Sequence, residues 1–346
     1  AITSSREDIL SPVPEPPAGS TSPVYHGLKS MNGSIPAFGV GTVRINSDVI
    51  NWPAKGGGER VREKIPAADG RYTGLVLVFD LNTGAPRAIF PDGVVQSYRV
   101  GATSALGAKH LAREDATRLG MLGAGWQARA HLLALDAVFD LETVEVYAPT
   151  PESREAFAEE MADRVSPTVE AASDPEAVVK GADVVQCTTN ATTPVFSRDW
   201  LEPGTHVGVI RNYEAPDDFF EPEWFDAFAQ SWTAITQLEE LGDQLNERPI
   251  RTKNINNYVI EGEEPVPKFA GATDEPLCDW AQVPGLSEVI ADPALGRSSP
   301  EGITGFFNEG MGIQFAAVGK RLCDLAEAED LGRELPTELF TQEYHP

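Results

Sequence analysis

The segment that most constrains the fold of this chain is residues 123–128, which read G-A-G-W-Q-A. It follows a short apolar run and precedes apolar residues at helical spacing, which is the pattern of a strand, a tight turn and a helix. Gly123 allows a sharp reversal, Gly125 has no side chain to keep a pyrophosphate away, and the small Ala128 allows close helix–strand packing. The helix would offer free N–H groups and its positive dipole end to phosphates. We therefore expect a dinucleotide at this turn, with the cofactor-binding residues Gly123, Gly125, Trp126, Gln127 and Ala128.

Strand and helix patterns alternate after this turn. Residues 141–147 alternate apolar and polar side chains, which completes a strand-helix-strand unit. We expect further helices at 152–162 and 175–180, and strands at 166–170, 183–187 and 206–210. Such an alternation predicts an α/β fold class with a parallel, doubly wound sheet of Rossmann type.

The two ends of the chain have a different character. Residues 72–80 and 85–90 are β-rich runs joined by a Leu-Asn-Thr-Gly turn, and 97–113 reads as an Ala-rich helix. Residues 313–328 have helical periodicity, and we expect this helix to pack back on the N-terminal part. We therefore predict a Rossmann domain at 115–312 and a discontinuous α+β domain at 1–114 and 313–346. The segment 246–285 lacks periodicity, which indicates a lid, an interface arm or a partly disordered loop.

The charge of the chain excludes some classes of partner. The 346 residues carry a formal net charge of −26, spread along the whole sequence. Because like charges repel, we expect neither nucleic acid nor an acidic membrane surface as a partner. The absence of a bilayer-length apolar run and of an export segment predicts a soluble, cytoplasmic protein. The acidity fits either a high-salt habitat or an ordinary acidic cytosolic protein.

The spacing of cysteine and histidine argues against metal and hydrolase chemistry. The three cysteines are far apart without a C-x-x-C pair, and the five histidines include no H-x-x-H or H-E-x-x-H spacing. We therefore expect no disulfide framework, no metal site and no Ser-His-Asp hydrolase.

Three motifs together resemble one family. The sequence R-V-G-A-T-S-A starts at Arg99, L-A-R closes the same helix at residues 111–113, and the turn at 123–128 contains Gln127. In order and spacing they are similar to the ornithine cyclodeaminase/mu-crystallin family. The resemblance implies a homodimer that oxidises or reduces a C–N bond at the α-carbon of an amino acid with NAD or NADP. It also implies an outer domain built from both chain ends.

The resemblance assigns three cations to the substrate carboxylate. Hydride transfer requires the α-carbon to be held against the nicotinamide, and an arginine fork grips a carboxylate with two hydrogen bonds. By resemblance, Arg44 and Arg99 are substrate-binding, and Lys64 is a third cation that is also a candidate catalytic group. The spacing from Arg44 to Lys64 is shorter than is usual in the family, and Lys55 lies nearby.

One family segment differs in this chain. Where cyclodeaminases carry an acid–base Asp, residues 210–218 read I-R-N-Y-E-A-P-D-D. Glu214 is the nearest carboxylate and our candidate catalytic acid–base group, while Tyr213 and Arg211 are candidate donors. Glu214 is alternatively a solvated loop residue. Cyclodeaminase activity on ornithine is therefore our second interpretation.

The end of the strand at 141–147 indicates the cofactor. An acid there would bind the ribose hydroxyls of NAD, but the sequence continues A-P-T-P-E-S-R. Thr150 and Arg154 favour NADP over NAD. Residues Thr188, Thr189 and Asn190 follow the strand at 183–187 and match a family loop that lines the nicotinamide; alternatively they form a capping turn.

The function that we predict is hydride transfer between NADP(H) and the α-carbon of a small amino or imino acid, as in an imino-acid reductase or an amino-acid dehydrogenase. The first alternative is an ornithine cyclodeaminase-type ammonia lyase that uses NAD catalytically. The second is a non-catalytic protein that binds NADPH and a small ligand.

Overall fold

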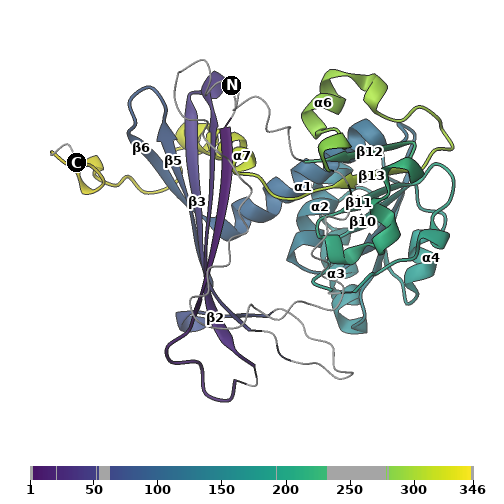
Figure 1. Ribbon diagram of the computed structural model, residues 1–346, viewed down its shortest axis with the longest axis horizontal. Coiled ribbons are helices and arrows are strands. Elements are labelled where there is room, and N and C mark those ends of the chain that lie inside the picture. Colours follow the sequence, from purple (N-terminus) through teal and green to yellow (C-terminus); the bar gives the residue numbers. More distant parts are fainter. Residues whose placement is uncertain are drawn as a thin grey trace. The chain divides into compact units, whose positions relative to one another are not determined.

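The computed structural model describes residues 3–20, 22–51, 53, 63–191, 193–231, 278 and 280–343, which form two compact units (Figure 1). The described residues up to Gln96 and from Met311 onward belong to the first unit, and those between belong to the second. Both chain ends therefore contribute to one unit. The boundary falls inside helix α1 (Asp92–Leu111), which we had assigned to the first domain entirely.

The physical reason lies in what the two parts of α1 pack against. Val95, near the start of the helix, belongs to the apolar core of the first unit. Ala105 and Ala108, farther along, belong to a core of the second unit.

An antiparallel sheet forms the first unit. Its strand order is β1-β2-β3-β5-β6, with β4 paired to β3. The bounds are β1 (Thr3–Pro12), β2 (Val24–Ile35), β3 (Val40–Asn51), β4 (Glu63–Ile65), β5 (Thr73–Asp80) and β6 (Pro86–Pro91). The predicted strands at 72–80 and 85–90 are confirmed as β5 and β6. Their turn is held by Asp80, whose carboxylate accepts the N–H groups of Asn82 and Thr83, both at 2.9 Å.

The C-terminal helix α7 (Gly312–Ala328) packs on this sheet, as its periodicity predicted. Phe315 and Ala316 of α7 join Val76 and Val78 of β5 in one buried cluster. The helix begins at a very close approach, because a Cβ on Gly33 would lie 2.2 Å from the backbone of Gly312. Glycine at this point lets the helix start against β2.

The second unit is built on a parallel sheet, with strand order β12-β13-β11-β10-β7-β8-β9. Each neighbouring pair of strands is parallel. The bounds are β7 (Arg118–Leu122), β8 (Thr143–Tyr147), β9 (Thr168–Ala171), β10 (Val184–Cys187), β11 (His206–Val209), β12 (Ala227–Gln230) and β13 (Thr304–Phe307). The predicted α/β fold class with a doubly wound sheet is therefore confirmed.

Apolar clusters cover the two faces of this sheet. In the described part of this unit, the helices besides α1 are α2 (Trp126–Asp136), α3 (Pro151–Ala162), α4 (Pro175–Val179) and α6 (Leu286–Ala291). Met121 of β7 packs with Leu132 of α2 and Phe157 of α3. The next residue, Leu122, packs with Val178 of α4 instead. Successive strand side chains alternate between faces, so the sheet is buried on both sides.

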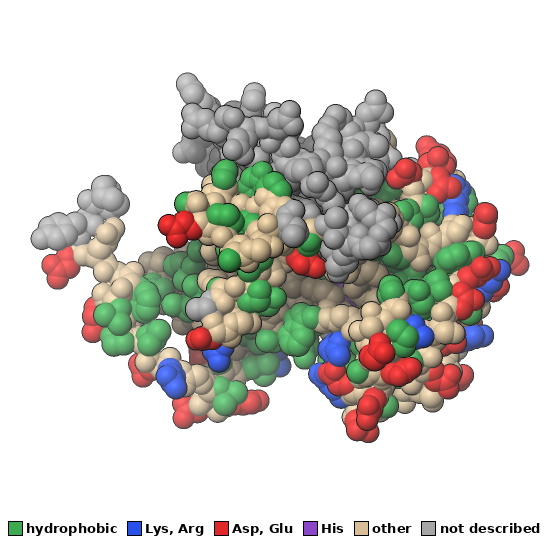
Figure 2. All heavy atoms as spheres, turned by 90° about the horizontal axis from the view of Figure 1, so that it is seen from below, with side chains coloured by type: hydrophobic (Ala, Val, Ile, Leu, Met, Phe, Trp, Pro, Cys, Tyr) green, Lys and Arg blue, Asp and Glu red, His purple; other side chains and the backbone are tan. Residues whose placement is uncertain are grey.

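Short 3-10 helices occupy connecting segments, and their bounds are Pro36–Phe38, Ala68–Gly70, Arg198–Trp200, Asn212–Glu214, Asp217–Phe220, Pro222–Trp224, Trp280–Gln282, Pro293–Leu295 and Thr337–Leu339. Of the segment 246–285 that we singled out, residues 246–277 and 279 lie outside the described residues. No helix in the described ranges is long and apolar enough to span a membrane. Figure 2 shows acidic side chains scattered over the surface seen there, in keeping with the spread of acidic residues along the chain.

Candidate functional site

The turn after β7 lies at the point where the strand order of the parallel sheet reverses. Strands β7 and β10 are neighbours there, and the chain runs outward from them in opposite directions. Ligands of such sheets bind beyond the carboxyl ends of the strands at this switch point. The sequence G-A-G-W-Q-A occupies this position, and α2 begins with Trp126.

The two glycines of the turn are required for different reasons. Gly123 has a φ of +110°, and a Cβ there would lie 2.8 Å from the carbonyl oxygen of Thr188, so the protein itself requires glycine. Gly125 has a φ of −86°, and a Cβ there would have no described neighbour within 4 Å. No contact within the described part of the protein therefore requires a glycine at position 125. A pyrophosphate bound close to the backbone would require one, and the open space above Gly125 fits such a group.

Ala128 and the start of α2 complete this cradle. Ala128 is fully buried against the sheet, as close packing requires. Gly125 is the N-cap of α2 and supplies no side-chain cap, so the helix terminus is shaped for an external acceptor. Trp126 is 59% exposed at the first helical position, and Gln127 is half-buried. The residues present therefore fit a dinucleotide.

The loop after β10 packs on the nucleotide turn. The backbone N–H of Thr188 donates to the carbonyl of Leu122 at 2.8 Å, and Thr188 is buried. Thr189 is half-buried and Asn190 is exposed. The structure thus brings these three predicted residues beside the turn at the carboxyl edge of the sheet.

Glu214 is completely buried at the end of the 3-10 helix Asn212–Glu214, so our solvated-loop interpretation is wrong. Its carboxylate accepts the backbone N–H groups of Ile210 and Arg211, each at 3.0 Å, and that of Thr189. Burial raises the pKa of Glu214 to about 7, while the hydrogen bonds from Thr189 and Ile210 act in the opposite direction. Both carboxylate oxygens are thus engaged by backbone, which differs from the contacts of the acid–base group that we expected.

Arg99 lies at the same edge of the second unit. It is buried in α1, and a Cβ on Gly310 would lie 2.6 Å from its guanidinium nitrogens. Gly310 follows β13, so the guanidinium lies against the backbone of the β13 loop. A buried arginine at the strand ends supports our interpretation of Arg99 as an anion-binding residue and disfavours a surface role.

A buried chain of hydrogen bonds, which we did not predict, connects α1, α2 and the residue after β13. His131 Nδ1 donates to the carbonyl of Gln127 at 2.8 Å, because a carbonyl only accepts, and burial lowers the pKa of His131 to about 4. The neutral ring then accepts from the Ser104 hydroxyl at 3.1 Å. Ser104 accepts in turn from the side-chain amide of Asn308 at 2.8 Å, and that amide also donates to the carbonyl of Val100 at 2.9 Å.

In the first unit, Arg44 projects from the buried face of β3. Asp92 grips its guanidinium with two bonds of 2.7 Å, and the guanidinium lies 5.2 Å from the ring centroid of Phe315. Asn46 and Asp48 share this face, because alternate residues of a strand point to one side. Lys64 on β4 pairs with Asp48 at 2.7 Å and is 42% exposed.

On β3 the usual pattern, in which apolar side chains are buried and polar ones are exposed, is reversed. In β3 the polar residues at 42, 44, 46 and 48 are buried, while the apolar residues at 43, 45 and 49 are only partly buried. The sequence T-V-R-I-N-S-D-V carries this alternation, and it was the signal that would have identified Asn46 and Asp48 as buried residues beside Arg44. A buried polar strand face requires partners, here supplied within the unit.

After β8, at the start of α3, Thr150 and Arg154 lie beside the end of the second strand, as the sequence places them. Thr150 is the exposed N-cap of α3. Arg154 is half-buried, and its guanidinium donates to the carbonyl of Ala148 at 2.9 Å. A cation therefore lies at the end of β8, next to the nucleotide turn, since Gly123 N–H donates to the carbonyl of Tyr147 at 2.8 Å.

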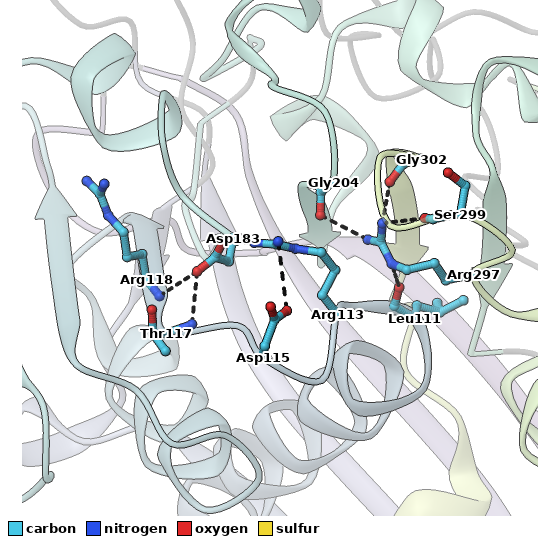
Figure 3. A network of polar contacts seen from close by, with 10 residues as sticks. All are labelled: Leu111, Arg113, Asp115, Thr117, Arg118, Asp183, Gly204, Arg297, Ser299 and Gly302. Carbon is cyan, nitrogen blue, oxygen red and sulfur yellow. Dashed lines mark hydrogen bonds and ion pairs between the residues drawn. The ribbon is translucent and has the colours of Figure 1, made fainter.

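Two arginines, Arg113 of the L-A-R motif and Arg297, hold the scaffold together at the opposite edge of the sheet (Figure 3). Arg297 donates to the carbonyl groups of Leu111 at 3.0 Å and Gly204 at 3.1 Å. Arg113 pairs with Asp183, which also accepts the backbone N–H groups of Thr117 and Arg118, each at 2.9 Å. These contacts tie α1 to the amino ends of the strands, away from the nucleotide turn.

His206 belongs to the same scaffold. Its Nδ1 lies 2.9 Å from the hydroxyl of Thr304, and burial lowers its pKa to about 3, so the ring is neutral. In the described part of the chain, no cluster of three histidine, cysteine or acidic residues is arranged to hold a metal.

Comparison with known proteins identifies the family. The model of the ornithine cyclodeaminase/mu-crystallin family matches residues 63–329, so the chain belongs to this family. A Delta(1)-pyrroline-2-carboxylate reductase of Bacillus cereus is 28% identical over 267 residues, covering 76% of this chain and 74% of that protein. An alanine dehydrogenase of Archaeoglobus fulgidus is 28% identical over 263 residues, covering 75% and 73%.

Among solved structures, Thermococcus litoralis Delta(1)-pyrroline-2-carboxylate reductase in complex with NADH and L-proline matches with a TM-score of 0.66. The match has 20% identity and covers 96% of this chain and 90% of that one. This likeness shows a shared fold.

Proposed function

We propose that the chain is an NAD(P)-dependent oxidoreductase that acts on the C–N bond at the α-carbon of a small amino or imino acid. The observation that carries this proposal is the open space above Gly125 at the switch point, with the Arg99 guanidinium at the same strand edge. The names of the relatives support it, since they are reductases of a cyclic imino acid and a dehydrogenase of an amino acid.

The roles of the residues follow from their positions. The N-terminus of α2 would hold the pyrophosphate over Gly125, and residues 188–190 would line the nicotinamide. The bound cofactor supplies or accepts a hydride. Arg99, Arg44 and Lys64 are our candidates for binding the substrate carboxylate. Arg44 already has a fork partner in Asp92, so Arg99 is the strongest of the three candidates.

We further propose NADP(H) as the preferred cofactor. Arg154 lies at the end of β8, where the 2′-phosphate of NADP would lie, and the strand end carries no acid. The neighbouring Thr150 is exposed and offers a hydroxyl.

The proposed activity is tested by following nicotinamide absorbance with NADPH and NADH. The substrates are a panel of cyclic imino acids and 2-oxo acids with amines, and the reverse direction uses the matching amino acids. We expect NADPH oxidation with at least one imine. Ammonia release without net nicotinamide change would indicate the cyclodeaminase alternative. Cofactor-dependent stabilisation without turnover on any substrate would indicate the binding-protein alternative.

We also propose a homodimer formed through the outer face of the first sheet. Apolar side chains on β3, β5 and β6 lie on the face opposite α7, in register as Val43 with Leu77 and Ile89, and Ile45 with Leu75. Leu75 is 42% and Ile89 37% exposed. A contiguous exposed apolar face of this kind marks an association surface.

Light scattering after gel filtration tests the dimer. We expect a mass of two chains, and a shift toward one chain in Leu75→Glu. A single-chain mass for the wild type at micromolar concentration would contradict the dimer.

A further inference from the structure

Glu214 is a buried acid to which the proposed function assigns no role. Its side chain is 0% exposed, yet it stands in a loop at the candidate nicotinamide edge. The sequence around it differs from the family pattern, so its role has to be derived from its own contacts.

The contacts of Glu214 join two loops. One oxygen accepts the N–H groups of Ile210 and Arg211, each at 3.0 Å, at the end of β11. The other accepts the N–H of Thr189, in the loop after β10. The backbone adds a fourth link, because the carbonyl of Glu214 accepts the N–H of Val195 at 2.9 Å.

These links reach the nucleotide turn. Thr189 follows Thr188, and the N–H of Thr188 donates to the carbonyl of Leu122 at 2.8 Å. The carbonyl of Thr188 lies so close to Gly123 that it would touch a Cβ placed there. Moving Thr189 would therefore disturb the packing of the loop on the turn. The Glu214 carboxylate is fully buried, so the three backbone N–H groups that it binds would lose their acceptor without it, which is costly to a fold.

We propose, on the basis of the function proposed above, that Glu214 is a positioning residue that fixes residues 188–190 against the nicotinamide and takes no proton from substrate. The carboxylate acts through Thr189. Glu214 lies in the segment where the family carries its acid–base Asp, and there it has a structural role in the loop that contains Tyr213.

Glu214→Gln tests this role. A glutamine has one acceptor oxygen and one donor nitrogen, so it cannot satisfy three N–H groups as a carboxylate does. We expect the nucleotide Kd to rise at least about fivefold, because a buried N–H loses its acceptor. We expect kcat to fall by less than about tenfold. Asp217→Asn, which changes an exposed carboxylate of the same loop, is the matched control and should leave both values unchanged.

The opposite pattern would overturn the proposal. A proton donor or acceptor contributes about 10²–10⁴-fold to rate, so a kcat loss of that size with an unchanged nucleotide Kd would make Glu214 an acid–base group. Glu214→Asp retains the carboxylate and should recover part of the nucleotide affinity.

Amide hydrogen exchange of the wild-type protein needs no variant. We expect slow exchange at Thr189, Ile210 and Arg211 and fast exchange at the exposed Asn190. Equally fast exchange at all four would overturn the proposal even if the variant failed to fold. Failure of the proposed function would appear differently, as absence of nucleotide binding and turnover in the wild type with the protection pattern intact.

Discussion

Gly310 lies directly against Arg99: a single Cβ on the glycine would come within 2.6 Å of two guanidinium nitrogens. The glycine after β13 therefore leaves the space in which the arginine head lies. Because the two residues are 211 positions apart in the sequence, only the fold brings them together.

The first prediction concerns this pair. Gly310→Ala should push the guanidinium from its place and raise the KM for the imino acid, with little effect on NADPH binding. Arg99→Ala should raise the same KM by about ten- to hundredfold, since a charge-assisted hydrogen bond contributes about 1.5–3 kcal/mol. Arg118→Ala, an exposed arginine at the far end of β7, is the control. Unchanged KM in both variants would remove Arg99 from the substrate site.

The two glycines of the turn should respond differently to alanine. Gly125→Ala places its methyl group in open space, so we expect unchanged thermal stability and a nucleotide Kd raised by about tenfold or more, about 1.4 kcal/mol. Gly123→Ala forces a positive φ and a clash with Thr188, so it should lower Tm as well. Thermal melts with and without NADPH separate the two effects. Undiminished NADPH affinity in Gly125→Ala would show that the cofactor does not lie there.

Cofactor choice should depend on Arg154. Arg154→Glu places negative charge at the end of β8, and we expect NADPH affinity to fall about tenfold or more while NADH affinity changes little. Arg164→Glu, a surface arginine beyond α3, is the matched control. Titration of both nucleotides by fluorescence measures the ratio. A wild-type preference for NADH would refute the NADP assignment.

The buried histidine in the chain of hydrogen bonds predicts an acid sensitivity. The pKa of His131 is about 4 in the folded protein and 6.5 in the unfolded chain. As the pH falls, the unfolded chain therefore takes up a proton at this histidine before the folded protein does. The contribution of neutral His131 to the free energy of unfolding is present above pH 6.5 and is lost as the pH falls toward 4. The loss amounts to about 3 kcal/mol. The difference in free energy of unfolding between the wild type and His131→Gln should shrink over this range; parallel pH profiles would contradict a neutral buried ring.

The sequence predicted most of the second unit and less of the first. Residues 123–128 identified the turn because glycine spacing has a steric cause, and the helix at 313–328 was found within one residue because its periodicity is strong. Strands β12 and β13 were not predicted, since each has only four residues and the sequences A-F-A-Q and T-G-F-F show no alternation of apolar and polar side chains. Strands β1 and β2 were missed as well, because β1 is rich in polar residues and β2 contains two glycines, so both lack the usual strand pattern.

The residues of the candidate site were harder to predict from the sequence than the strands and helices. Arg44 and Arg99 were assigned by resemblance to the family, whereas Asp92, which binds Arg44, is 48 positions away from it and carries no local signal. Glu214 was predicted as a candidate acid–base group or, alternatively, a solvated loop residue. Its burial was not foreseen, because its partners are backbone N–H groups and sequence does not reveal where those point.

The central claim is hydride transfer between the cofactor and the α-carbon of the substrate. The direct measurement uses NADPH carrying deuterium at C4 in each of its two stereochemical positions, with an imine found active in the absorbance assay. We predict that one of the two labelled cofactors delivers deuterium to the α-carbon of the amino-acid product, seen by mass spectrometry and NMR. Product with no deuterium at the α-carbon from either cofactor would contradict the claim.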